Sequence, residues 1–175
     1  LWCRKGYALA REERAGEAVE AFDRAVELDP GVGRAWNERG LALMELGRYG
    51  DAAASLDRAL AEGSGDARIQ YQRGLAAFHL ERYDDALDAL QEATRTDPGD
   101  TGAWYYLGLT RLHHGDPEGA VDALDASLAL DSRDLHAWYH RGAALSSLGR
   151  YDEAERSYRE ALSLDPYHAR ARQAM

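Results

Sequence analysis

Two histidines with helical spacing are the side chains with the clearest potential for chemistry. His136 and His140 are four residues apart, and on a helix two imidazole rings at this spacing can reach a common metal ion. Two ligands do not make a metal site, and the adjacent His113 and His114 must point in different directions on a helix. We therefore expect these histidines to be solvated or to line a groove, and we predict no metal site.

The chain carries no recognisable motif for catalysis. It contains no glycine-rich phosphate loop, no serine or cysteine nucleophile motif and no HExxH sequence. Cys3 is the only cysteine, so an intrachain disulfide is impossible and a thiolate metal cluster is excluded. The sequence predicts a protein that is not an enzyme and that binds no cofactor.

The charge balance argues against two classes of partner. The 175 residues carry a formal net charge of −10, which disfavours binding to nucleic acid or to an anionic membrane surface. No stretch approaches the roughly 18 apolar residues of a membrane span. A single cysteine fits a reducing compartment, so we expect a cytoplasmic protein. Because the chain starts at Leu1, we also expect it to be a fragment of a longer protein.

Three residue types recur along the chain with one period of 34 residues. The glycines are Gly6, Gly40, Gly74, Gly108 and Gly142, the tryptophans are Trp2, Trp36, Trp104 and Trp138, and the alanines are Ala18, Ala52, Ala86, Ala120 and Ala154. Gln70 occupies the tryptophan position that is missing. Such a period is typical of stacked helical modules, which usually bind a partner and do not catalyse a reaction.

Each module is expected to form two helices. In the fifth module the first helix is predicted over 135–148, Gly149 ends it, and the second helix is predicted over 151–164. Asp165 and Pro166 then stop the second helix, because proline cannot continue one. A glycine inside a helix costs about 1 kcal/mol relative to alanine. Its recurrence in the first helices therefore predicts close approach between paired helices.

The modules divide the chain into five repeats and a short final segment. The expected repeats cover about 1–32, 33–66, 67–100, 101–134 and 135–166, and 167–175 is expected to begin a further, truncated helix. Gly63 and Ser64 form a softer break than the Asp-Pro pairs of other repeats. Without a solvating cap, the last second helix would expose an apolar strip, which would favour end-to-end self-association.

These spacings resemble those of the tetratricopeptide repeat family. Its 34-residue helix–turn–helix unit has Trp, Gly, Ala, an aromatic residue, Ala and Pro at the same positions. The fifth module, WYHRGAALSSLGRYDEAERSYREALSLDP, matches almost throughout, and the resemblance covers the whole chain. It implies an all-α fold, an α-solenoid of five helix–turn–helix modules in a right-handed superhelix. The first helices would then line a concave groove.

One position departs from the family pattern. The family usually has leucine before the repeat glycine, whereas this chain has Lys5, Arg39, Arg73, Leu107 and Arg141 there. An arginine that is partly buried needs a partner. Matching each position with one in the preceding module gives the pairs Asp23–Arg39, Asp57–Arg73, Gln91–Leu107 and Asp125–Arg141. The acid is missing where the arginine is missing, so we predict salt bridges at three of the four junctions.

The resemblance also implies which residues face the groove. Carried over position by position, the candidates for peptide binding are Arg34, Asn37, Glu38, Arg68, Tyr71, Gln72, Tyr105, Tyr106, His136, Tyr139 and His140. Tyrosine offers apolar area and a hydroxyl at low rotamer cost, which suits peptide binding. Tyr106 and His140 are the most informative candidates, because the family often has asparagine at their positions.

The best-known ligand mode of the family is not expected here. That mode grips a C-terminal carboxylate with lysine, arginine and asparagine, but Cys3 and Tyr7 occupy its first positions in this chain. Arg34 and Arg68 could still attract an acidic segment, because guanidinium groups match carboxylates.

The sequence predicts a non-catalytic scaffold that holds a peptide or protein segment in the groove. The alternative is a structural spacer or self-association module of a larger protein, with no dedicated ligand. A repeat protein that reads one RNA base per module is disfavoured, because the groove positions differ between modules and the net charge is negative.

Overall fold

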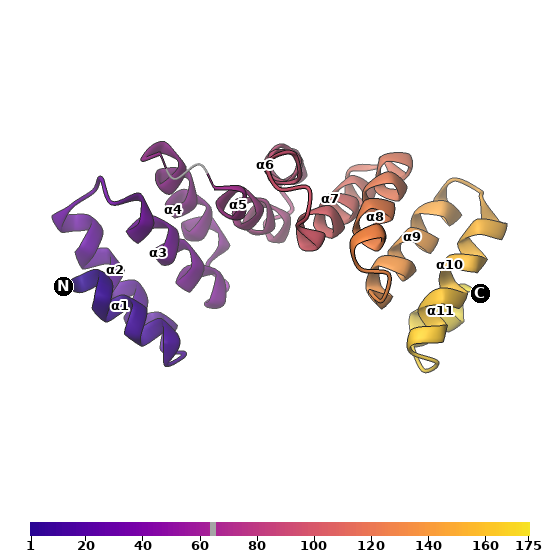
Figure 1. The fold of residues 1–175 in the computed structure, drawn as a ribbon, viewed down its shortest axis with the longest axis horizontal. Helices are drawn as coiled ribbons and strands as arrows, with labels where there is room; N and C mark the ends of the chain where they lie inside the picture. Colours follow the sequence, from indigo (N-terminus) through magenta and orange to yellow (C-terminus); the bar gives the residue numbers. More distant parts are fainter. Residues whose placement is uncertain (64–65) are drawn as a thin grey trace. The chain divides into compact units, whose positions relative to one another are not determined.

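The computed structural model describes residues 1–63 and 66–175, and these residues form helices joined by turns, with no strand among them (Figure 1). The predicted all-α class is therefore confirmed. The described residues fall into two compact units, Leu1–Thr96 and Asp97–Met175.

Consecutive helices pack as pairs within each unit. The first unit contains α1 (Trp2–Arg11), α2 (Ala15–Leu28), α3 (Gly33–Glu45), α4 (Tyr49–Ala61), α5 (Ala67–His79) and α6 (Tyr83–Thr96). The second unit contains α7 (Thr101–His114), α8 (Pro117–Leu130), α9 (Leu135–Ser147), α10 (Tyr151–Leu164) and the short α11 (Ala169–Ala174). Helices α9 and α10 agree with the prediction, except that α9 ends one residue earlier than expected.

The repeated glycines allow the two helices of a pair to touch. A Cβ atom on Gly40 would lie 2.9 Å from Cγ of Leu56, and one on Gly142 would lie 2.5 Å from Cε1 of Tyr158. Leu56 is fully buried, and Tyr158 is almost fully buried. The predicted close approach is confirmed: each glycine makes room for a large side chain of the following helix.

Three of the repeated tryptophans attach the first helix of their repeat to the loop before it. The indole Nε1 atoms of Trp36, Trp104 and Trp138 donate hydrogen bonds to the backbone carbonyl oxygens of Pro30, Pro98 and Ser132, at 2.9, 2.9 and 3.0 Å. Each carbonyl lies six residues before its tryptophan. This common bond gives the tryptophan period a structural reason.

The predicted break after the second repeat differs from the others. Gly63 follows α4 with a φ of +84°, whereas Ser64 lies outside the described residues. Gln70 stands at the tryptophan position of α5, and its buried Oε1 atom has no hydrogen-bond partner among the described residues.

The turn between paired helices also recurs at a fixed position, and it requires a left-handed backbone. Gly47, Gly115 and Gly149 have φ values of +70°, +86° and +73°. Glu13 and Glu81 occupy the same position in their repeats with φ values of 58° and 59°. A side chain is disfavoured in this conformation, so these two turns are strained relative to the other three.

Candidate functional site

Three arginines fix the junctions between helix pairs. The Nε atoms of Arg39, Arg73 and Arg141 donate to the Oδ1 atoms of Asp23, Asp57 and Asp125, at 2.5, 2.6 and 2.5 Å. All three predicted salt bridges are therefore confirmed. Their arginine side chains are only 20, 30 and 19% exposed, so each pair is partly buried and positions the first helix of its repeat.

Two serines complete the environment of two of these arginines. Nη1 of Arg39 donates to Oγ of Ser55 at 2.6 Å, and Nη1 of Arg141 donates to Oγ of Ser157 at 2.7 Å. Both serines are buried. The sequence reasoning missed them, although the signal was available: each serine follows its arginine by 16 residues.

Within the second unit, the structure brings most of the predicted aromatic candidates together on α7 and α9. The ring centroids of Tyr105 and Tyr106 are 5.2 Å apart, those of Tyr105 and His140 are 6.0 Å apart, and those of Tyr139 and His140 are 5.0 Å apart. His136 lies one helical turn before His140 on α9. We call these five residues the histidine–tyrosine face.

The surroundings of His140 disfavour a positive charge on its imidazole. Burial, reinforced by the nearby cationic groups of His136, His113 and Arg170, lowers the pKa of its imidazole to about 4. The carboxylate of Asp134 acts in the opposite direction. His140 is therefore neutral near pH 7. Burial, followed by the carboxylate of Asp134, raises the pKa of the Tyr105 hydroxyl, which stays protonated.

The sequence reasoning missed one contributor to this face. The ring of His168 lies 5.2 Å from Tyr139 and 6.2 Å from His136, measured between centroids. Its Nδ1 atom accepts a hydrogen bond from the backbone amide of Ala171 and caps α11. The repeat period contains the signal, because His168 stands 34 residues after the α9 cap Asp134.

In the first unit, the predicted candidates Arg34 and Glu38 line a hollow between α1 and α3. This hollow has a volume of about 490 Å³ and is also lined by Tyr7, Ala10 and Arg11. The guanidinium carbon of Arg34 lies 5.3 Å from the centroid of the Tyr7 ring. Burial raises the pKa of Glu38, and the charges of Arg34 and Arg68 oppose that shift. Arg68, the first-turn residue of α5, thus lies within electrostatic reach of this hollow.

Two amide side chains of the first unit bury acceptor atoms without a partner. Oδ1 of Asn37 on α3 and Oε1 of Gln72 on α5 make no hydrogen bond to any described residue. Gln72 is only 6% exposed. Buried acceptors of this kind are rare in folded proteins. The neighbouring candidate Tyr71 on α5 is half-buried.

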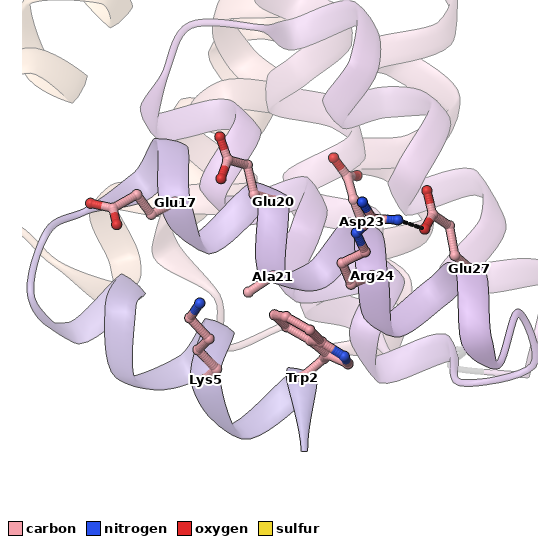
Figure 2. A pocket seen from close by; sticks show the side chains of 8 residues that line it. All are labelled: Trp2, Lys5, Glu17, Glu20, Ala21, Asp23, Arg24 and Glu27. Atoms are coloured by element: carbon pink, nitrogen blue, oxygen red, sulfur yellow. Dashed lines mark hydrogen bonds and ion pairs between the residues drawn. The ribbon is translucent and has the colours of Figure 1, made fainter.

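A second hollow of the first unit lies between α1 and α2 (Figure 2). Trp2 and Lys5 project from α1, and Nζ of Lys5 lies 5.2 Å from the centroid of the Trp2 ring. Four carboxylates line the hollow from α2, those of Glu17, Glu20, Asp23 and Glu27. Asp23 is bound to Arg39, Glu27 is paired with Arg24 at 2.8 Å, and Glu17 is paired with Arg14 at 2.7 Å. Three of these four carboxylates are therefore already engaged.

The part of the chain that the structure describes offers no group of three or more His, Cys, Asp or Glu residues arranged to hold a metal ion. In the same part, no helix is long and apolar enough to cross a membrane.

Comparison with known proteins agrees with the helix pairs. Sequence models described as tetratricopeptide repeat match residues 3–67, 71–134 and 136–168. No curated protein sequence matches the chain.

Several solved structures share the fold. The chain is similar to YrrB, described as a TPR protein with an unusual peptide-binding site, with a TM-score of 0.92, 23% identity, and coverage of 99% of this chain and 89% of that chain. It is also similar to MamA, with a TM-score of 0.88, 25% identity, and coverage of 94% of this chain and 96% of that chain. For MamA from Desulfovibrio magneticus RS-1, residues 41 to the end, the TM-score is 0.89 at 20% identity, with coverage of 96 and 95%.

Proposed function

Because the chain belongs to the tetratricopeptide repeat family, whose fold typically mediates interactions between proteins, we propose that it is a non-catalytic scaffold. It binds a peptide or protein segment against the first helices of its repeats, through the candidate residues on α3 and α5 in the first unit or those on α7 and α9 in the second. The partner is a protein, not a nucleic acid, because the chain carries a net charge of −10.

The observation that carries this proposal is the buried, unpartnered Oε1 atom of Gln72. Leaving a buried acceptor without a hydrogen bond costs about 1–3 kcal/mol. Rotation of the Gln72 side chain towards a bound peptide would let this oxygen accept from a peptide N–H and remove that cost. The Oδ1 atom of Asn37 offers a second acceptor of the same kind on α3. The structurally similar YrrB is described as having a peptide-binding site, which supports the same class of ligand.

The polar and aromatic composition of these faces also supports a peptide ligand. Tyr105, Tyr106 and Tyr139 supply rigid amphipathic surface in the second unit. Arg34 and Glu38 supply charges beside the 490 Å³ hollow of the first unit. Such a mixture is suited to adaptable recognition of polar chains.

Selection from a displayed library of random peptides tests the proposal. Wild-type protein is expected to enrich a defined set of peptides, and the double variant Y106A/H140A is expected to lose them. The matched control Y151A/H114A removes a tyrosine and a histidine of the same unit outside the proposed face, and it should retain them. Thermal unfolding of all variants checks that each one is folded.

The outcome also separates the proposal from its alternative. If no peptide is enriched and the protein associates with itself in light scattering as its concentration rises, then the chain is a structural spacer or self-association module. Enrichment that survives Y106A/H140A would move the site to the first unit.

A further inference from the structure

The carboxylates within the helices of the second unit all lie on α8 and α10, and α10 also carries Arg156 and Arg159. Helices α7, α9 and α11 contain no aspartate or glutamate. Their titratable cationic side chains are Arg111, His113, His114, His136, His140, Arg141, Arg170 and Arg172. Helices α8 and α10 contain seven carboxylates, those of Glu118, Asp122, Asp125, Asp152, Glu153, Glu155 and Glu160. The histidine–tyrosine face lies on α7 and α9, and neither of these helices contains a carboxylate.

The carboxylate of Asp134, which influences the pKa of both His140 and Tyr105, is already hydrogen-bonded to the backbone. Oδ1 of Asp134 accepts hydrogen bonds from the amides of His136 and Ala137, at 2.8 and 3.1 Å. It caps α9. It is also the only carboxylate that raises the pKa of His140 noticeably.

His140 lies where cationic groups from three elements converge. His136 comes from its own helix, His113 from α7 and Arg170 from α11, and all three disfavour a further positive charge on the imidazole. The neutral hydroxyl-bearing rings that face it are those of Tyr105 on α7 and Tyr139 on α9. From α10, Tyr158 contacts Tyr139 at a centroid distance of 5.9 Å.

A ligand carboxylate beside this face would meet no carboxylate from α7, α9 or α11 that could repel it. Carboxylates are the common partners of imidazolium and guanidinium groups, and charged hydrogen bonds of this type are stronger than neutral ones. The adjacent tyrosine rings can pack against the methylene groups of an acidic side chain. A polyanion such as RNA is a poorer match, because the carboxylates of α8 and α10 would repel its extended phosphate backbone.

We propose that the histidine–tyrosine face binds an acidic peptide segment, with one glutamate or aspartate carboxylate beside His136 and His140 and the aliphatic part of the segment against Tyr105 and Tyr139. This inference rests on the proposed function and adds the chemistry of the partner.

The test uses a short fluorescent peptide rich in glutamate and the same peptide with glutamine at every glutamate position. Fluorescence anisotropy with the whole chain, at one ionic strength, is expected to show binding of the glutamine peptide that is about ten- to a hundredfold weaker. The variants H136Q and H136Q/H140Q should remove most of this difference in affinity. Because His136 is exposed, H136Q is expected to fold normally.

The matched control is H79Q/H114Q, which removes two histidines outside the face. It should preserve the difference between the peptides. Histidine ring resonances in nuclear magnetic resonance spectra supply a second readout, because the glutamate peptide should shift those of His136 and His140.

Several results would overturn the inference. Equal affinity for the two peptides, no binding of either, or tighter binding of a single-stranded RNA would each contradict it. If R34Q/R68Q removes the difference and H136Q/H140Q preserves it, acidic segments bind the first unit instead. The proposed function has a separate outcome: library selection that enriches peptides without acidic residues would leave it standing while this inference fails.

Discussion

Arg39 and Asp23 are 16 residues apart in the sequence and meet with 2.5 Å between Nε and Oδ1. The pair joins the second helix of one repeat to the first helix of the next. Its arginine side chain is 20% exposed and its aspartate side chain 40% exposed. The pair is therefore neither a solvated surface contact nor a dry internal one, and its contribution to stability should lie between those limits.

Breaking this pair should destabilise the protein moderately. We expect Asp23→Asn to lower the free energy of unfolding by about 1–2 kcal/mol, between the values for exposed and buried pairs. Urea unfolding of D23N, R39L and the double variant gives the coupling energy. The control D51N disrupts the exposed Arg48–Asp51 pair and should cost less than about 0.5 kcal/mol. Equal costs for D23N and D51N would contradict this interpretation.

The buried serines should contribute through the same arginines. Ser55→Ala removes the acceptor for Nη1 of Arg39 and is expected to cost about 1–2 kcal/mol. Arg73 has Ala89 at the corresponding position, so Ala89→Ser should supply a hydrogen bond that is missing there. We expect A89S to be neutral or to stabilise by up to about 1 kcal/mol. An S55A variant as stable as the wild type, or an A89S variant clearly less stable than the wild type in chemical denaturation, would refute the assignment.

Replacing a glutamate that has a positive φ should increase the stability of the protein. Glu81→Gly relieves a side chain at a φ of 59°, and the relief exceeds the added chain entropy of glycine, so we expect a gain of up to about 1 kcal/mol. Gly149→Ala introduces the same strain at a φ of +73° and should destabilise by about 1 kcal/mol. Thermal melting of both variants measures the difference, and a destabilised E81G would count against strain at this turn.

His140 should make the stability depend on pH. Its pKa is lowered to about 4 in the folded protein, below the ordinary value of about 6.5. The unfolded chain therefore binds the proton more readily, and stability that is present above about pH 6.5 is lost as the pH falls towards 4. Relative to H140Q, the wild type should lose about 2–3 kcal/mol more between these pH values, after allowance for partial exposure. Parallel curves for the two proteins would contradict this expectation, and H114Q should follow the wild type.

Much of the fold could be predicted because the repeat period reports local packing directly. Gly40 must accommodate Leu56, and Arg39 must find an acid; each requirement involves two positions with a constant separation. Covariation between modules was enough to identify Asp23 as the partner of Arg39. The helix pairs and all three salt bridges followed from that regularity.

The environment of the candidate site was harder to predict because it depends on side chains from separate elements. Ser55 and Ser157 share their repeat position with buried alanines such as Ala89, and only the direction of the arginine Nη1 atom reveals their role. His168 and Arg170 belong to the short segment after the fifth repeat, whose length predicted a truncated helix but no contact. The lowered pKa of His140 depends on both burial and these distant neighbours.

The arginine–aspartate register has a consequence for how such an array can gain or lose repeats. Removing residues 33–66 as one unit would place Asp23 before Arg73, and the acid would still meet an arginine. Removing residues 101–134 would place Gln91 before Arg141, and a partly buried guanidinium would lose its counter-ion. Loss of one repeat therefore preserves the arginine–aspartate pair at some junctions and destabilises the protein at others, so stability depends on the order of the repeats.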